Sequence, residues 1–193
     1  MGNIYTVSAE GGPVQELLPR NQHSQTPSWS HDGESIVYSV ARDGHEDLEG
    51  LFILDLKSRK SSKVPGSESK RDPVLSFDGR YLLAVDDEDP SAVVVYDFHT
   101  QVWKTVARSK NFYRIRPTND GKYFYFQDLL SAGEPIFRMH VGDWKVERVL
   151  SFESMLKGDV VRCRFAGIMQ DGSPMVIAVR GGYEIYSIDL DLP

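Results

Sequence analysis

The chain has 193 residues, and 22 Lys and Arg against 28 Asp and Glu give it a formal net charge of −6. Hydrophobic residues make up 40% and charged residues 26%, which is typical of a globular protein that folds without a metal or disulfide staple. The acidic balance and the lack of a long Lys/Arg run argue against a nucleic-acid-binding surface, because phosphate contacts require clustered cations.

Cysteine content and hydropathy limit the chemistry further. Cys163 is the only cysteine, so no intrachain disulfide and no cysteine-rich zinc or iron–sulfur site can form. Alternation along a strand directs Arg162 and Arg164 to the opposite face from the Cys163 thiol, so we expect a buried structural cysteine. No apolar run approaches the roughly 18 residues that span a bilayer, and no signal-peptide pattern opens the sequence. We expect a soluble protein, with cytoplasm and periplasm both open.

Internal repeats determine the expected architecture. Four Asp-Gly pairs recur at steps of 46, 42 and 51 residues, starting at Asp32, Asp78, Asp120 and Asp171. An apolar run follows each pair, which indicates a β-hairpin because glycine adopts a positive φ and aspartate tolerates it. A second set of apolar runs repeats at steps of 47, 42, 43 and 49 residues, starting at Ile4, Leu51, Val93, Ile136 and Ile185. Two registers with one period predict a repeat of four short antiparallel strands.

Four strands per 40 to 50 residues are typical of a β-propeller blade, so we predict an all-β fold. A β-sandwich also has short strands but would not repeat its turn chemistry every fourth strand. We expect one propeller domain over 1–193, with about four blades and an incomplete or open ring. Residues 1–18 supply the third and fourth strands of a first blade, full blades span 27–65, 72–107 and 115–150, and a partial last blade spans 160–190.

One blade carries a family resemblance. Residues 27–38 read Pro-Ser-Trp-Ser-His-Asp-Gly-Glu-Ser-Ile-Val-Tyr and resemble the TolB-type, WD-like propeller repeat, whose typical blade reads Pro-x-Trp-Ser-Pro-Asp-Gly before an apolar strand. The copy at 75–79 lacks the Trp, the copy at 116–121 lacks Trp and Ser, and only Asp171-Gly172 remains in the last. The resemblance implies a TolB-like propeller, and a chain that forms the C-terminal part of a longer bacterial protein. It implies no reaction.

Large aromatic residues recur at strand positions that would fill the space between blades: Trp29, Phe52, Tyr81, Tyr96, Trp103, Tyr123, Tyr125, Phe137 and Tyr186. If Trp29 is buried, its replacement by Ala should cost about 3 to 5 kcal/mol.

Signatures of catalysis are missing from the sequence. It contains no Gly-x-Ser-x-Gly elbow, no phosphate loop, no His-Glu-x-x-His and no dinucleotide fingerprint. The five histidines are scattered without the spacing that directs two imidazoles at one metal. We therefore expect no enzymatic activity, no metal site and no cofactor.

Charged residues mark the candidate contact surfaces. Two acidic loops are expected to lie on one face of the propeller, and they contain Asp43, Glu46, Asp47, Asp86, Asp87, Glu88 and Asp89. Such loops bind Ca²⁺ or a basic partner, although like charges in exposed loops more often mark only a solvated surface. Basic and aromatic residues gather at the first strand of the third full blade: Arg108, Lys110, Phe112, Tyr113, Arg114 and Arg116.

The first strand of a blade lines the central channel, where Arg114 and Arg116 would bind a carboxylate or phosphate. The competing interpretation is that acids of a neighbouring blade neutralise them.

These observations favour a non-catalytic propeller that binds protein or peptide through its loop face, as an interaction or sensing module of a larger bacterial protein. The alternative is a propeller that filters substrate for a serine hydrolase of the oligopeptidase class. A third alternative, an enzyme site within the channel, requires converging carboxylates or histidines that the sequence does not reveal. Besides a protein or peptide partner, a second copy of the chain is a candidate partner for the open edge blades. No nucleic-acid binding and no membrane insertion are expected.

Overall fold

Three four-stranded antiparallel sheets form the middle of the chain. The computed structural model describes residues 3–18, 23–40 and 49–181. Blade 1 contains β3 (Ser24–Trp29), β4 (Ser35–Val40), β5 (Gly50–Asp55) and β6 (Lys60–Lys63). Blade 2 contains β7 (Lys70–Leu75), β8 (Tyr81–Asp86), β9 (Ala92–Asp97) and β10 (Val102–Arg108). Blade 3 contains β11 (Tyr113–Pro117), β12 (Tyr123–Gln127), β13 (Ile136–His140) and β14 (Val146–Leu150).

A two-stranded sheet lies at each end of this series. β1 (Tyr5–Thr6) pairs with β2 (Gln15–Glu16) before blade 1, and β15 (Val160–Ile168) pairs with β16 (Pro174–Arg180) after blade 3. Between blade 3 and β15 lies α1 (Glu153–Leu156), and no helix of the described ranges is long and apolar enough to cross a membrane.

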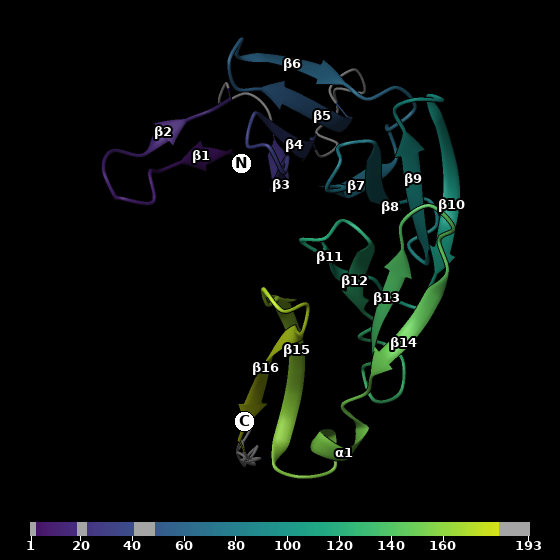
Figure 1. Ribbon diagram of the computed structural model, residues 1–193. Coiled ribbons are helices and arrows are strands. Elements are labelled where there is room, and N and C mark those ends of the chain that lie inside the picture. The colour runs from purple at the N-terminus through teal and green to yellow at the C-terminus, as the bar shows by residue number, and fades with distance from the viewer. Residues whose placement is uncertain (1–2, 19–22, 41–48, 182–193) are drawn as a thin grey trace, which may run out of the picture.

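The sheets follow one another around an arc, as Figure 1 shows. The first strand of each blade lies on the inner side of the arc, where β7 contacts β3 and β11, and β11 contacts β15. The predicted all-β fold of four-stranded antiparallel blades is confirmed, and the arc is open rather than closed. The full sheets start at residues 24, 70 and 113, where the sequence analysis placed 27, 72 and 115. The strand expected from Ile185 lies outside the described residues.

Hydrophobic side chains on both faces of each blade hold the arc together. On β8, Leu82 and Ala84 pack towards blade 1, whereas Leu83 and Val85 pack towards blade 3, and all four are at most 2% exposed. Successive residues of a strand point to opposite faces, so one strand contributes to two interfaces. Two further clusters join β1 and β2 to blade 1 and β15 to blade 3. The core is therefore a row of interfaces between blades.

The turn after the first strand has the same hydrogen bonds in all three blades. In blade 1 the Ser30 hydroxyl donates to Asp32 (2.6 Å) and accepts from the Ser35 amide (2.9 Å). Ser76 with Asp78, and Thr118 with Asp120, repeat both contacts. The following glycines have φ between 70° and 73°, the left-handed conformation that favours glycine. The Asp-Gly repeat of the sequence is thus a repeated turn whose first side chain is Ser or Thr.

The burial expected for Trp29 is wrong, because this side chain is 56% exposed. Trp29 pairs with Ile36, which places it on the face of blade 1 that looks towards β1 and β2. In the described chain, the sheet beside this face has only two strands, β1 and β2. It covers the outer part of the face, at Tyr38 and Leu54, and leaves the inner edge open.

At the opposite end of the arc, apolar side chains are likewise exposed on the face that no further sheet of the described residues covers. Met175, Ile177 and Val179 of β16 are 46%, 54% and 45% exposed, whereas Cys163 and Phe165 of β15 are fully buried against blade 3. The expected burial of Cys163 is confirmed. The ideas that a second copy pairs with these edges, and that the chain is part of a longer propeller, stay predictions.

Phe124 and Trp29 give a matched test of the interface core. Phe124 is fully buried between blades 2 and 3, so Phe124→Ala should cost about 3 to 5 kcal/mol. Trp29→Ala should cost less than about 1 kcal/mol, as is usual for exposed positions. Chemical denaturation followed by tyrosine and tryptophan fluorescence measures both; similar losses for the two variants would contradict the assignment of the core.

The turns also predict how stability depends on pH. Hydrogen bonds from Ser30 and the Glu34 amide lower the pKa of Asp32, and those from Thr118 and the Lys122 amide lower the pKa of Asp120, both below the ordinary value of 3.8. A carboxyl whose pKa is lowered on folding stabilises the fold above its unfolded pKa, and this contribution disappears as the pH falls through the folded pKa. The urea concentration at the midpoint of unfolding should therefore decrease as the pH is lowered below about 4. The decrease should be smaller for the variant Asp32→Asn/Asp120→Asn; equal decreases would contradict this account.

Candidate functional site

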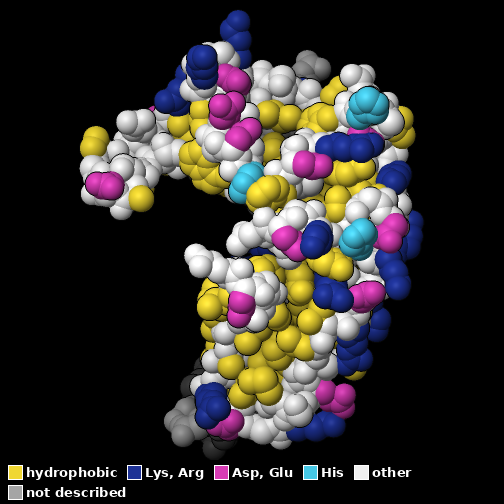
Figure 2. All heavy atoms as spheres, in the orientation of Figure 1, with side chains coloured by type: hydrophobic (Ala, Val, Ile, Leu, Met, Phe, Trp, Pro, Cys, Tyr) yellow, Lys and Arg dark blue, Asp and Glu magenta, His cyan; other side chains and the backbone are white. Residues whose placement is uncertain are grey.

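A hollow of about 490 Å³ lies on the inner side of the arc, where the first strands of the three blades meet. β3 contributes residues 26–28, β7 contributes 71–74 and β11 contributes 113–116 to its lining. The space-filling view shows the molecule hollowed on the side where the arc is open (Figure 2). The hollow is therefore a product of the radial arrangement of blades and not of any single blade.

Each of these first strands has a β-bulge at the hollow. Ladder pairing shifts between residues 25 and 28 in β3, between 71 and 74 in β7, and between 113 and 116 in β11, so that two residues face one on the next strand. The bulges contain Thr26, Asp72 and Arg114, with φ of 47°, 54° and 52°. Residues other than glycine rarely adopt this conformation, and bulges redirect side chains, often near functional sites. The same strained position thus faces the hollow three times.

Four of the predicted contact residues line the hollow: Phe112, Tyr113, Arg114 and Arg116. Phe112 is 8% exposed and packs on Phe126 at a ring-centroid distance of 4.8 Å, so it forms part of the apolar floor. Arg114 and Arg116 are exposed. Arg71 and Asp72 of the neighbouring blade join them and form an ion pair with each other.

The remaining predicted residues that the structure describes, Arg108, Lys110 and residues 86–89, lie outside the lining of the hollow. In blade 2 the acidic loop is paired with cations of its own blade: Lys70 with Asp86 (3.9 Å), Arg71 with Asp87 (2.6 Å), and Arg108 with Asp89. Glu88 and Lys110 are exposed. Asp43, Glu46 and Asp47 lie outside the described residues. Because these loop charges are neutralised locally, the acidic loop of blade 2 is a salt-bridged rim.

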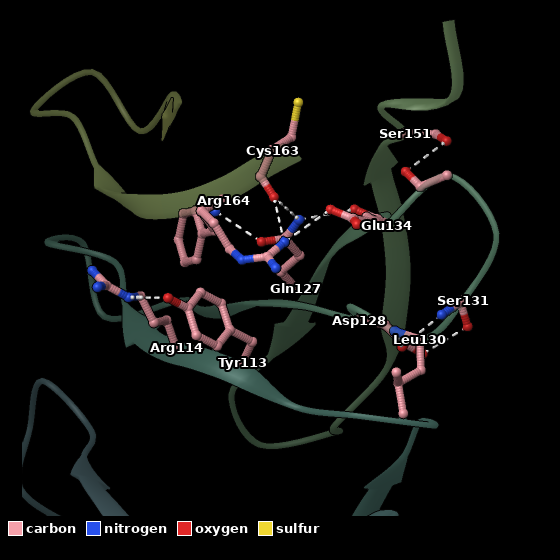
Figure 3. Close-up of polar contacts among 12 residues, drawn as sticks. Tyr113, Arg114, Gln127, Asp128, Leu130, Ser131, Glu134, Ser151, Cys163 and Arg164 are labelled. Carbon is pink, nitrogen blue, oxygen red and sulfur yellow. Dashed lines mark hydrogen bonds and ion pairs between the residues drawn. The ribbon is translucent and has the colours of Figure 1, made fainter. Parts of the chain in front are cut away.

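Tyr113 lies at the junction between blade 3 and β15, as Figure 3 shows. Its hydroxyl accepts a hydrogen bond from Nε of Arg114 (3.0 Å). The guanidinium groups of Arg114 and Arg164 lie over its ring, with Cζ at 5.4 Å and 5.7 Å from the ring centroid. Arg164 is paired with Glu134 (3.0 Å), so its charge is compensated. Among the described residues, no ion pair joins Arg114 to a carboxylate.

Loss of solvent and neighbouring charges shift the pKa values of two groups near this junction, Arg116 and Cys163. Loss of solvent around the guanidinium, and then the charge of Arg114, lower the pKa of Arg116 from its ordinary value. Nη1 of Arg116 donates to the Ile115 carbonyl (2.9 Å), which turns the group back against the strand. Burial, followed by the charge of Glu134, raises the pKa of the Cys163 thiol, which disfavours the thiolate form.

Two residues missed by the sequence analysis position the site (Figure 3). The Asp128 carboxylate accepts from the Lys110 amide (3.2 Å) and from the Leu130 and Ser131 amides (2.9 and 3.0 Å), which fixes the connection leading into β11. Burial alone would raise the pKa of Asp128, but its hydrogen bonds, led by that from Ser109, outweigh burial, so the pKa is lowered.

Gln127 links blade 3 to β15. Its side chain is fully buried, donates to the Cys163 carbonyl (3.1 Å) and accepts from the Phe165 amide (2.8 Å).

The described residues contain no group of three or more His, Cys, Asp or Glu side chains that could hold a metal ion. The hollow is lined by arginine, tyrosine and apolar side chains, which are the kinds of side chain that bind and orient ligands in protein sites. This arrangement suits recognition of an anionic or amphipathic group.

The structure resembles solved propellers. TolB from Acinetobacter baumannii matches with a TM-score of 0.73 and 17% identity, over 94% of this chain and 44% of that chain. A putative TolB from Agrobacterium tumefaciens matches with a TM-score of 0.62 and 19% identity, over 77% and 56%. The β-propeller domain of the Trilobed protease from Pyrococcus furiosus, which has an open velcro topology, matches with 0.53 and 18%, over 66% and 42%.

The fold is therefore a TolB-like β-propeller, as the repeat in the sequence predicted. The chain spans 44% and 56% of the lengths of the two TolB chains. No protein-family model and no curated protein sequence matches the chain.

Gln127 offers a test of how the last two strands are held. Gln127→Leu removes the partner of the Phe165 amide and a donor to the Cys163 carbonyl, which should cost about 1 to 3 kcal/mol. The loosened contact should also speed labelling of the buried Cys163 by a thiol reagent. Gln15→Leu, at an exposed position of β2, is the control; equal labelling rates in the two variants would contradict the role of Gln127.

Proposed function

We propose that the chain is a non-catalytic propeller module that binds a protein or peptide segment at the hollow on the inner side of its arc. The observation that carries this proposal is the hollow itself, built from the same bulged position of three successive blades. Backbone strain of this kind persists only where the surrounding structure enforces it, and it gathers at ligand sites. The module would serve as the sensing or interaction part of a larger bacterial protein.

The lining suits an extended segment with both polar and apolar side chains. Pro73 and Val74 of β7 and Val85 of β8 are buried and supply an apolar wall, while Arg71, Arg114 and Arg116 supply donors. Ligand sites typically combine an apolar surface with a few polar groups that fix orientation. The paired acids and cations of blade 2 lie beside this hollow and would form a polar rim.

A substrate-filtering propeller of a serine hydrolase is the second candidate. It is favoured by the match to the propeller domain of the Trilobed protease. The two candidates differ in what the complete reading frame would encode, because the hydrolase requires a domain with a Gly-x-Ser-x-Gly nucleophile. Under either candidate the propeller contacts a polypeptide, and the reaction, where there is one, takes place outside these blades.

Leu129 and Leu130 allow a direct test. Leu129 lines the hollow, whereas its neighbour Leu130 does not and is 66% exposed. Peptides selected from a random display library on the immobilised protein should bind the wild type and Leu130→Trp alike. Leu129→Trp fills the hollow and should weaken binding by about tenfold or more, the loss caused by roughly 1.4 kcal/mol. Selected peptides that bind both variants equally would overturn the proposed location, and a library that yields no binder would overturn the function.

A further inference from the structure

The charge of the hollow is opposite to that of the chain. The protein carries a net charge of −6, yet the hollow is lined by three arginines, Arg71, Arg114 and Arg116, against one aspartate, Asp72. The aspartate is already paired with Arg71, which also pairs with Asp87 at 2.6 Å. The excess positive charge of the hollow therefore belongs to Arg114 and Arg116.

Several other arginines of the described chain have carboxylate partners. Arg80 pairs with Asp97 (3.0 Å), Arg138 with Glu147 (2.9 Å), and Arg164 with Glu134 (3.0 Å). No ion pair among the described residues involves Arg114 or Arg116. Each guanidinium has five N–H donors. The hydrogen bonds within the described chain use Nε of Arg114 and Nη1 of Arg116, so most donors of both groups stay available.

Two features bring these cations together in a position suited to a ligand. Arg114 occupies the bulge, where a φ of 52° turns the strand, and Tyr113 holds its Nε at 3.0 Å. Arg116, two residues on, lines the same hollow, and the charge of Arg114 contributes to the lowered pKa of Arg116, so the two charges repel. An anion between them would remove that repulsion and would accept several charge-assisted hydrogen bonds.

We propose that Arg114 and Arg116 form a carboxylate-binding subsite, and that its occupant is a peptide segment with a carboxylate next to an apolar residue. The subsite deepens the proposed function and rests on it. The carboxylate is that of an acidic side chain or of a peptide C-terminus. A peptide is favoured because the buried Pro73, Val74 and Phe112 place an apolar wall beside the two cations, which suits a neighbouring side chain of the same segment.

The test uses unlabelled octapeptides with acetylated N-termini and isothermal titration calorimetry. A C-terminally amidated peptide of alternating Glu and Leu carries side-chain carboxylates, and a Gln and Leu peptide with a free C-terminus carries only the terminal one. The amidated Gln and Leu peptide carries none. We expect at least one of the first two to bind, and the third to bind about tenfold more weakly or less. Binding should weaken as NaCl is raised.

The variants compared are Arg114→Gln/Arg116→Gln, the charge-preserving Arg114→Lys/Arg116→Lys, and Arg148→Gln. Arg148 is an exposed arginine on the outer strand of the same blade and serves as the matched control. The Gln pair should lose about tenfold or more in affinity, the Lys pair should recover part of it, and Arg148→Gln should stay within about twofold of the wild type. Denaturation midpoints near that of the wild type confirm that the variants fold.

Several outcomes would overturn the subsite. These are an absence of binding by both carboxylate peptides, equal binding by the amidated Gln and Leu peptide, or unchanged affinity in the Gln pair. Trigalacturonate, an acidic saccharide, serves as a competitor. If it occupied the hollow at a lower concentration than the carboxylate peptides do, the occupant would be an acidic saccharide and the peptide proposal would be overturned. Library-selected peptides that lose affinity in Leu129→Trp but not in the Gln pair would leave the proposed function intact and overturn the subsite alone.

Discussion

A sheet with hydrophobic side chains on both faces is stable only when a neighbour covers each face, and this constraint shapes the whole molecule. β4 illustrates it: Val37 packs towards blade 2 while Tyr38 packs towards β1 and β2, and both are fully buried. Four short strands cannot form two cores by themselves, so each blade depends on the next. Where the described chain ends its row of blades, apolar side chains stay exposed, at Trp29 on one side and Ile177 on the other.

The same radial packing creates the hollow. Neighbouring blades pack through their faces, which brings the first strands together on the inner side of the arc. A regular strand would alternate its side chains between the two apolar interfaces. The bulges at Thr26, Asp72 and Arg114 break that alternation and present polar side chains to the hollow instead. Packing thus places the strands, and the local irregularity gives the surface its chemistry.

The sequence predicted the fold well because its main signal is local and repeated. Asp32, Asp78 and Asp120 each mark a turn with the same hydrogen bonds, and the apolar runs after them alternate as expected. Exposure of Trp29 was missed because it depends on how far the two-stranded sheet of β1 and β2 covers this face of blade 1, which no local pattern records. The bulges were missed because their residues differ in type. A signal existed, however: each lies six residues before an Asp-Gly pair.

The pairing of charges explains why an acidic protein presents a basic site. In blade 2 the acidic loop and the cations beside it lie on adjoining strands of one sheet, so they neutralise each other at its rim. Blade 3 differs at the corresponding loop, where Gln127 and Asp128 replace the acidic run and are used for backbone contacts. No carboxylate of that loop is left for β11, because Asp128 is engaged by Ser109 and Ser131 and Glu134 is paired with Arg164 of β15. The positive charge of Arg114 and Arg116 is therefore a consequence of blade 3 using its two loop acids for other contacts rather than to balance these arginines.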